Sequence, residues 1–282
     1  MRAGFIGLGH IGRGMAHGLL AAGFPTTVYD VMPEGPAELA AVGARSASSP
    51  AEVAQASDAI GICVRTDDEV LDVIAGDQGL LAGASPGLLI AIHSTVRPST
   101  IKEAARLAAE KGARVVDAPV SRGAPNADGR SIVYMLAGAE ADIADARELV
   151  KGSAKDIIVA GPLGAAMALK ICNNLVTYLE FLAAAEADRL ARLTGLAPEL
   201  LLQVMTANGN ATPSMQALIS GRLSLPGPPP PEMVKTFEGI SAVAEKDLDC
   251  ALEVGRELGV DLPGATLARQ AIRHVYLNGF QD

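Results

Sequence analysis

Hydrophobic positions in the first half of the chain form short runs that are separated by longer amphipathic stretches. The run Ala59–Val64 is continuously apolar, as expected for a strand that is buried on both faces of a sheet. Similar runs recur at residues 4–6, 26–29, 88–92, 113–116, 132–136 and 157–159. Amphipathic stretches at 10–22, 67–74, 98–111 and 140–150 predict helices. This alternation predicts βαβ units and a parallel sheet.

The pattern changes after Gly161, where long helical stretches replace the short runs. Residues 163–194 contain no proline and are rich in alanine and leucine, so they predict one long helix that Gly195 ends. Its apolar content indicates burial, either against its own domain or in a subunit interface. Further helices are predicted from Pro198, over 240–258 and over 265–277, with a stiff proline-rich loop at 225–231.

These two patterns together predict an α/β protein with two domains. Residues 1–162 are expected to form a doubly wound Rossmann domain, and residues 163–282 an all-helical domain. The long helix would run from one domain to the other. A chain of 282 residues is long enough for two domains of ordinary size.

The charge balance and the chain start limit the possible partners and locations. A net charge of −9 argues against non-specific binding to nucleic acid or to an anionic membrane surface. No apolar run approaches the roughly 20 residues of a membrane span. The first residues lack a signal-peptide pattern and lead directly into a predicted strand. We therefore expect a cytoplasmic protein with no nucleic-acid or membrane partner.

The cysteines and histidines do not indicate a metal site. Cys63, Cys172 and Cys250 are far apart and have mainly apolar neighbours, so we expect buried thiols in a reducing compartment. The four histidines show no metal-ligand spacing with these cysteines.

A glycine-rich turn follows the first predicted strand and begins the first predicted helix. It reads G-x-G-x-x-G and consists of Gly7, Leu8, Gly9, His10, Ile11 and Gly12. In this setting the first glycine permits a tight turn, the second lets the backbone approach a pyrophosphate, and the third allows close packing of helix on sheet. The pyrophosphate would lie over the amides of the helix N-terminus. The turn therefore predicts a dinucleotide site.

Asp30 ends the second predicted strand, where a carboxylate can bind the adenosine ribose hydroxyls. A carboxylate there also repels the additional phosphate of NADP, and no arginine follows it directly. The alternative role is that of a turn residue before Pro33 and Gly35. We predict NAD as the cofactor, with NADP possible.

Three further segments carry polar groups to the expected ligand edge. His93–Pro98 and Asp117–Ala124 each follow a predicted strand, and ligands of open α/β sheets lie at the carboxyl ends of the strands. Gly161–Gly164 precedes the long helix, on which Lys170 and Asn174 are four residues apart and share a face. An ammonium and an amide on a mostly apolar helix are costly to bury without partners. The two groups either have a structural role at the border of the core or of a subunit contact, or they belong to an active site.

With these segments in order, the chain resembles the β-hydroxyacid dehydrogenases, the relatives of 3-hydroxyisobutyrate dehydrogenase, tartronate semialdehyde reductase and 6-phosphogluconate dehydrogenase. The resemblance covers nearly the whole chain. Four stretches carry it: the cofactor turn Phe5–Gly12, the substrate motif Asp117–Ser121, the catalytic helix from Gly161 to Asn174, and the motif Lys246–Leu248.

The resemblance implies a role for each matching residue. Lys170 would be the general acid/base that exchanges a proton with the substrate hydroxyl while a hydride passes to the nicotinamide, and Asn174 would hold the substrate. The substrate carboxylate would be bound by Ser121, Arg122 and Gly123. Besides the glycine turn and Asp30, the cofactor would be contacted by Val64, Arg65, Thr95 and Lys246. The implied substrate is a small anionic 3-hydroxy acid, or the matching aldehyde or keto acid, and the implied assembly is a homodimer or homotetramer.

The chain departs from the family pattern at several positions. Arg122 stands where the family usually has glycine, and a guanidinium can form a fork with an anion. One hypothesis is that the substrate carries an additional or differently placed anionic group; equal kinetics of Arg122→Gly on all acids would contradict it. The alternative is that Arg122 faces solvent or an acidic neighbour. Ala166 and Ile11 are small packing changes, and residues 233–244, including Phe237, match poorly.

Two other functions remain open at this point. One is an imine reductase-like enzyme on the same scaffold, although such enzymes usually lack a lysine at the position of Lys170. The other is an NAD(P)-binding regulatory protein without turnover, which the presence of Lys170, Asn174 and Lys246 disfavours.

Overall fold

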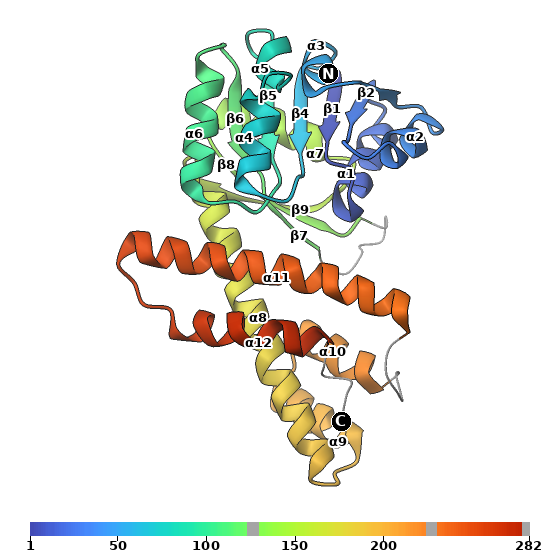
Figure 1. The fold of residues 1–282 in the computed structure, drawn as a ribbon, viewed down its shortest axis with the longest axis vertical. Coiled ribbons are helices and arrows are strands. Elements are labelled where there is room, and N and C mark those ends of the chain that lie inside the picture. Colours follow the sequence, from blue (N-terminus) through green and yellow to red (C-terminus); the bar gives the residue numbers. More distant parts are fainter. Residues whose placement is uncertain (123–129, 224–229, 278–282) are drawn as a thin grey trace. The chain divides into compact units, whose positions relative to one another are not determined.

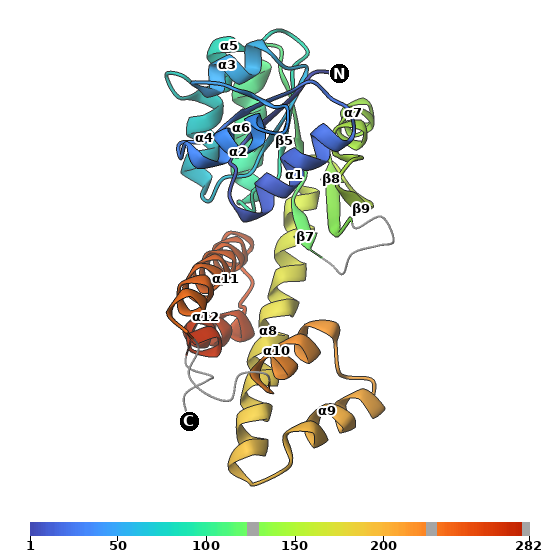
Figure 2. The same cartoon turned by 90° about the vertical axis from the view of Figure 1, so that its right-hand side faces the viewer.

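The computed structural model describes residues 1–122, 130–223 and 230–277. The chain forms two compact units, residues 1–170 and 171–282. The division falls inside the long helix, whereas the sequence pattern places the domain boundary between residues 162 and 163. Each unit is described by itself below (Figures 1 and 2).

The first unit is built on one mixed sheet. Its strands are β1 (Ala3–Ile6), β2 (Thr26–Tyr29), β3 (Arg45–Ser46), β4 (Ala59–Ile62), β5 (Leu89–Ile92), β6 (Arg114–Asp117), β7 (Val120–Arg122), β8 (Ile132–Ala137) and β9 (Ala154–Gly161). The strand order is β3-β2-β1-β4-β5-β6-β8-β7, and β9 pairs with β8. Strands β1 to β6 are parallel, while β8 runs antiparallel to β6 and β7. The chain moves outward from β1 in one direction and from β4 in the other, which confirms the doubly wound topology.

Helices cover both faces of this sheet. They are α1 (His10–Ala21), α2 (Glu34–Ala40), α3 (Pro50–Gln55), α4 (Asp67–Ala75), α5 (Leu80–Gly83), α6 (Pro98–Ala109) and α7 (Glu140–Val150). One buried cluster joins the sheet to α1, α2 and α7, and a second joins it to α3, α4, α5 and α6. Figure 2 shows α4 and α6 on one side of the strands and α1 and α7 on the other. Burial on both faces explains why β4 and β5 are uniformly apolar.

The second unit contains helices and, among its described residues, no strand. These helices are α8 (Ala165–Leu193), whose first turns belong to the first unit, α9 (Pro198–Ala207), α10 (Pro213–Leu223), α11 (Pro231–Leu258) and α12 (Pro263–Leu277). Helices α11 and α12 lie side by side (Figures 1 and 2), and a buried cluster joins them to α8. A smaller cluster joins the later part of α8 to α9 and α10. No described helix combines the length and the apolar character that a membrane span needs.

Several elements differ from the sequence-based expectation. Helix α11 begins at Pro231 rather than at residue 240, because proline lacks an amide hydrogen and is well tolerated at the first helical position. The sequence pattern does not predict β3, β7, α2, α3, α5 and α10, most of which are too short to show a period. The N-terminus of α3 could have been recognised, because the Ser49 hydroxyl accepts from the Glu52 amide and Pro50 follows directly.

The expectation of buried thiols is wrong for two of the three cysteines. Of the three cysteines only Cys250 is buried; Cys63 is half-buried and Cys172 is exposed. The reason lies in α8, which buries one face and leaves the opposite face open: Cys172 and Val176 are four residues apart on that open face. Leu190 and Leu193 of the same helix are 66% and 67% exposed, so the helices of its own chain do not cover all of α8, and its burial in a subunit interface stays a prediction.

Candidate active site

The carboxyl edge of the parallel sheet brings four loops together. The registers align the last residues of β1, β4, β5 and β6, namely Ile6, Ile62, Ile92 and Asp117. One more backbone hydrogen bond follows the end of β4, β5 and β6. The amides of Cys63, His93 and Ala118 donate to the last carbonyl of the neighbouring strand in the sheet, which belongs to Ile6, Ile62 and Ile92 respectively. The glycine turn and the predicted segments at Val64, His93–Pro98 and Asp117 therefore begin at one edge, as the sequence predicts.

The glycine turn has the geometry that its motif requires. Gly7 has φ +90°, a conformation that other residues rarely adopt. A Cβ atom on Gly12 would lie 2.0 Å from the Gly7 carbonyl oxygen, so only glycine fits where α1 passes the end of β1. By contrast, a Cβ on Gly9 would meet no heavy atom of the chain within 4 Å. The turn is thus closely packed on its inner side and open at Gly9.

The start of α1 fits an anionic group. Gly9 is the residue before the helix and has no side chain that could cap it, and the first turn contains no acidic residue. Amides at the positive end of a helix dipole favour a phosphate. His10 and Ile11 are exposed there, and Leu8 is buried below them. The residues present therefore fit the diphosphate of a dinucleotide.

Asp30 holds the glycine turn through its carboxylate. Oδ2 accepts from the Leu8 amide at 2.5 Å, and Oδ1 accepts from the Met32 amide at 2.8 Å. Each carboxylate oxygen keeps further lone pairs for a ligand hydroxyl. Asp30 therefore fixes the turn in addition to the ribose contact that the sequence predicts.

The neighbouring loops are linked in the same way, by a side chain of one loop and the backbone of another. The Ser94 hydroxyl accepts from the Val64 amide at 2.8 Å. The Arg65 amide donates to Glu69 at 2.8 Å, close to the start of α4. Thr95 is half-buried directly after Ser94. The Val64–Ser94 bond thus joins the loop that contains Arg65 to the loop that contains Thr95.

His93 is a structural residue and not a ligand. It is 3% exposed, its ring lies 2.8 Å from the Ala118 carbonyl oxygen through Nδ1, and it stacks on Phe5. Burial lowers the pKa of His93 to about 4, so the ring is neutral near pH 7. The neutral ring can donate from Nδ1 and joins β5 to the segment between β6 and β7.

Asp117 fixes the beginning of α8. It is fully buried, and its two oxygens accept from the amides of Gly164 and Met167, each at 2.9 Å. Burial raises the pKa of the Asp117 carboxyl, and these backbone hydrogen bonds oppose the rise. The first residue of the predicted substrate motif therefore acts on the helix that carries Lys170.

Lys170 and Asn174 lie one turn apart on α8, and both are buried, at 8% and 7% exposure. The Asn174 amide nitrogen donates to Asp247 at 2.7 Å. The Tyr178 hydroxyl donates to the same carboxylate at 2.9 Å, and the Lys246 ammonium lies 2.9 Å from it. The structure therefore brings Asn174 and Lys246 together around one aspartate in the second unit.

Ser121 is half-buried on β7. Arg122 ends that strand, and its side chain and Gly123 lie outside the described residues, as does most of the proline-rich loop at 225–231. Ser121, His10 and Ile11 line a groove of about 410 Å³ between α1 and the start of β8. Its described lining residues also include His17 and Arg130, and none of them is a carboxylate.

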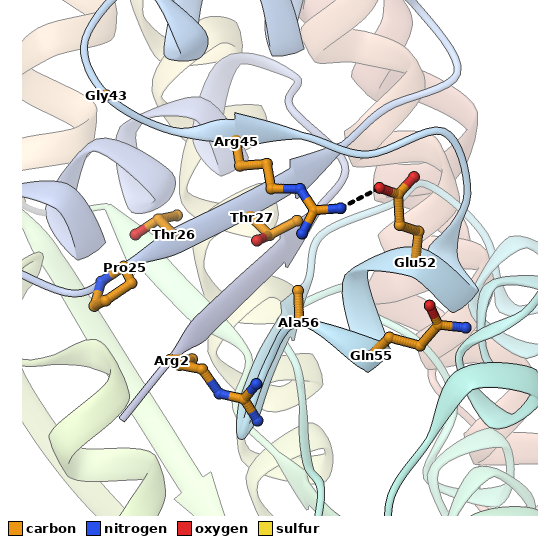
Figure 3. Close-up of a pocket in the computed structure, with 9 residues that line it drawn as sticks. All are labelled: Arg2, Pro25, Thr26, Thr27, Gly43, Arg45, Glu52, Gln55 and Ala56. Atoms are coloured by element: carbon orange, nitrogen blue, oxygen red, sulfur yellow. Dashed lines mark hydrogen bonds and ion pairs between the residues drawn. The ribbon is translucent and has the colours of Figure 1, made fainter.

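A second hollow, of about 460 Å³, lies at the opposite edge of the sheet (Figure 3). It is formed around the amino ends of β1, β2 and β3, where Arg45 pairs with Glu52 and Arg2 pairs with Asp58. Both arginines are thus neutralised by partners, and the hollow lies away from the glycine turn. Among the described residues no group of three metal-ligating side chains is present.

Comparisons with known proteins agree with this geometry. Residues 2–161 match the family model for the NAD binding domain of 6-phosphogluconate dehydrogenase, and residues 164–282 match that for the NAD-binding domain of NADP-dependent 3-hydroxyisobutyrate dehydrogenase. An uncharacterized oxidoreductase of Mycobacterium tuberculosis is 36% identical over 96% of this chain and 92% of its own length. The 2-(hydroxymethyl)glutarate dehydrogenase of Eubacterium barkeri is 34% identical over 96% of this chain and 87% of its own length.

The chain belongs to the β-hydroxyacid dehydrogenase family. A solved 3-hydroxyisobutyrate dehydrogenase of M. tuberculosis with L-serine has a TM-score of 0.81 and 28% identity, and covers 100% of this chain and 98% of that one. Family membership makes this chain an NAD(P)-binding oxidoreductase. Solved imine reductases match at 19–20% identity, which shows a shared fold alone.

Sequence reasoning missed several residues of this candidate site. Tyr178 follows Lys170 and Asn174 at the same four-residue spacing, so helical periodicity could have found it. Asp117 and Asp247 belong to the motifs Asp117–Ser121 and Lys246–Leu248, but the sequence predicts no role for either aspartate. Their partners are distant in sequence, since Asn174 and Asp247 are separated by 73 positions, and no local pattern reveals such a contact.

Proposed function

We propose that this chain is an NAD-dependent dehydrogenase of small 3-hydroxy acids, or a reductase of the matching aldehyde or keto acids, with Lys170 as general acid/base. The observation that carries the proposal is the buried pair Lys170 and Asn174 on one face of α8, in a chain whose glycine turn and family identify an NAD(P) site. A buried lysine in an apolar helix is costly unless it has a function or partners.

The residues divide the chemistry among them. Bound NAD⁺ supplies the hydride acceptor. Lys170 Nζ takes the proton of the substrate hydroxyl in oxidation and returns it to the carbonyl oxygen in reduction. The Asn174 amide holds the hydroxyl or the carboxylate. Ser121, with the backbone of Arg122 and Gly123, binds the carboxylate. Lys246 and Thr95 contact the cofactor.

NAD is preferred over NADP in this proposal because of Asp30. Its carboxylate lies at the end of β2 on the glycine turn, where it would accept from ribose hydroxyls and repel a ribose phosphate. The Arg122 side chain, in turn, would favour substrates with an additional anionic group. An assembly of two or four copies is supported by the exposed apolar side chains of α8, including Leu190 and Leu193. A cytoplasmic location is part of the same proposal.

The test is turnover of a panel of 3-hydroxy acids, aldehyde acids and imines with NAD and NADP, followed by absorbance of the reduced nicotinamide. We expect Lys170→Ala to lower kcat by about 10²–10⁴-fold, the usual contribution of a general acid/base. NADH binding should remain close to that of the wild type. Lys111→Ala removes an exposed lysine of the first unit and should leave both quantities unchanged.

The panel also separates the other functions. Turnover of imines in preference to the oxygen substrates would identify an imine reductase. NAD binding without turnover of any member would identify a regulatory protein. A Lys170→Ala enzyme with full kcat would refute the role of Lys170 while leaving the dehydrogenase activity established.

A further inference from the structure

The Asp247 carboxylate gathers two hydrogen-bond donors and one ammonium group within the second unit. Oδ2 accepts from Asn174 Nδ2 at 2.7 Å and from the Tyr178 hydroxyl at 2.9 Å, and Oδ1 lies 2.9 Å from Lys246 Nζ. Asp247 is 5% exposed and lies on α11, while Asn174 and Tyr178 lie on α8. A buried carboxylate requires such compensation, so these contacts are mutually dependent.

Tyr178 is held in the donor role. Burial, and then the adjacent Asp247 carboxylate, raise the pKa of its phenol far above the ordinary value. The hydroxyl therefore keeps its proton and can only donate toward the carboxylate oxygen. This donor occupies Oδ2 beside the Asn174 amide and fixes the direction from which that amide approaches.

The consequence for Asn174 is a single amide orientation. The two ends of a primary amide are similar in size, and rotation by half a turn exchanges a donor for an acceptor. Because Nδ2 donates to Asp247, Oδ1 is directed away from the carboxylate, and one Nδ2 hydrogen remains for another acceptor. The Asn173 side chain, 3.5 Å from that Oδ1, makes only a long contact with it.

We propose that Asp247 is a positioning residue for the reaction, which acts by fixing the Asn174 amide in the orientation that receives the hydroxy acid. The same carboxylate also holds Lys246, so one buried group orders both the predicted substrate contact and the predicted cofactor contact of this unit. Tyr178 completes the arrangement. This inference rests on the proposed function, because that function gives Asn174 its substrate.

The decisive kinetic experiment is a double-mutant cycle between Asp247→Asn and Asn174→Ala. Asp247→Asn keeps the size of the side chain but presents an amide to two hydrogen-bond donors and an ammonium group. We expect it to lower kcat/KM by about 10-fold or more, because small misplacements of a substrate contact have effects of this order. In the Asn174→Ala background the same change should have little further effect. If the two factors multiply, Asp247 does not act through Asn174 and the proposal is wrong.

A spectroscopic measurement tests the contact without turnover. In protein labelled with ¹⁵N-asparagine, the Asn174 side-chain amide is assigned by its loss in Asn174→Ala. One of its protons should be shifted downfield and slow to exchange in the wild type, and Asp247→Asn should abolish this. Asp249→Asn, on the same helix and half-exposed beside Arg269, is the matched control and should preserve it.

The two readouts distinguish the possible failures. An Asn174 signal that Asp247→Asn leaves unchanged would overturn the positioning role even in an active enzyme. A wild type that turns over no member of the substrate panel would refute the proposed function, and the spectrum would still decide whether Asp247 orients Asn174.

Discussion

Two buried aspartates, one in each unit, act on the same helix in different ways. Asp117 of the first unit accepts from the backbone amides of Gly164 and Met167 at the start of α8. Asp247 of the second unit accepts from side chains, two of which, Asn174 and Tyr178, stand further along α8. A buried carboxylate thus fixes the path of the main chain in the first unit and the orientation of side chains in the second.

The difference extends to the rest of the first unit. Asp30, Ser94 and His93 each join a side chain to the backbone of a neighbouring loop at the carboxyl edge of the sheet. A site built in this way depends on the path of the backbone and on glycines that permit it. A site built from side chains depends on rotamers. Disturbing the first unit should therefore change stability, and disturbing the second should change kinetics.

The largest effect is expected for Gly12→Ala. A Cβ atom at this position would lie 2.0 Å from the Gly7 carbonyl oxygen, so the backbone of the turn or of α1 must move. We expect the free energy of unfolding to fall by about 3 kcal/mol or more, the upper range for overpacking, and NADH binding to be lost with it. Urea unfolding and fluorescence titration with NADH measure the two effects.

Gly14→Ala is the matched control on the same helix. A Cβ there would meet no heavy atom of the chain within 4 Å. Replacing a helical glycine with alanine then stabilises by roughly 0.5–1 kcal/mol. Equal destabilisation by both variants would show that the first unit tolerates no added side chain along α1, and would remove the special role assigned to the turn.

The fold could largely be predicted because its main determinants are local. Continuous apolar runs marked β4 and β5, and their alternation with amphipathic stretches marked the doubly wound sheet. Short elements such as β3, with two residues, were missed because no period can be recognised in them. The extent to which its own chain covers α8 could not be predicted, because composition alone does not say how much of a helix its neighbours cover.

The candidate site, like the fold, has features that could be predicted from sequence and features that could not. The glycine turn and the spacing of Lys170 and Asn174 could be recognised because each motif lies within one strand-turn-helix unit or one helix. The positioning of those groups could not, since it depends on Asp117 and Asp247, whose hydrogen-bond partners are 47 to 73 positions away. Sequence therefore predicted the groups that would contact ligands, and the structure showed the groups that hold them.

A smaller effect is expected for Asp117→Ala. Its loss would leave the amides of Gly164 and Met167 without their acceptor at a buried helix start. We expect a loss of about 2 kcal/mol in the free energy of unfolding, in the range for buried unsatisfied groups and lost helix caps. Asp117→Asn retains one acceptor oxygen and should lose less. Asp156→Asn, at an exposed position of β9, is the control, and an equal loss there would contradict the capping role.

The smallest effect is the pH dependence that His93 contributes. Its pKa is about 4 in the folded chain, below the unfolded value of 6.5, so the unfolded chain binds more protons between these values. The contribution of His93 to stability is complete above about pH 6.5 and is lost as the pH falls toward 4. Between pH 7 and pH 5.5 this amounts to about 1 kcal/mol. His93→Gln cannot titrate and keeps a donor for the Ala118 carbonyl oxygen, so its urea unfolding should lose that part of the pH slope. A pH slope identical to that of the wild type would contradict this prediction, because it would mean that burial does not hold the His93 ring neutral.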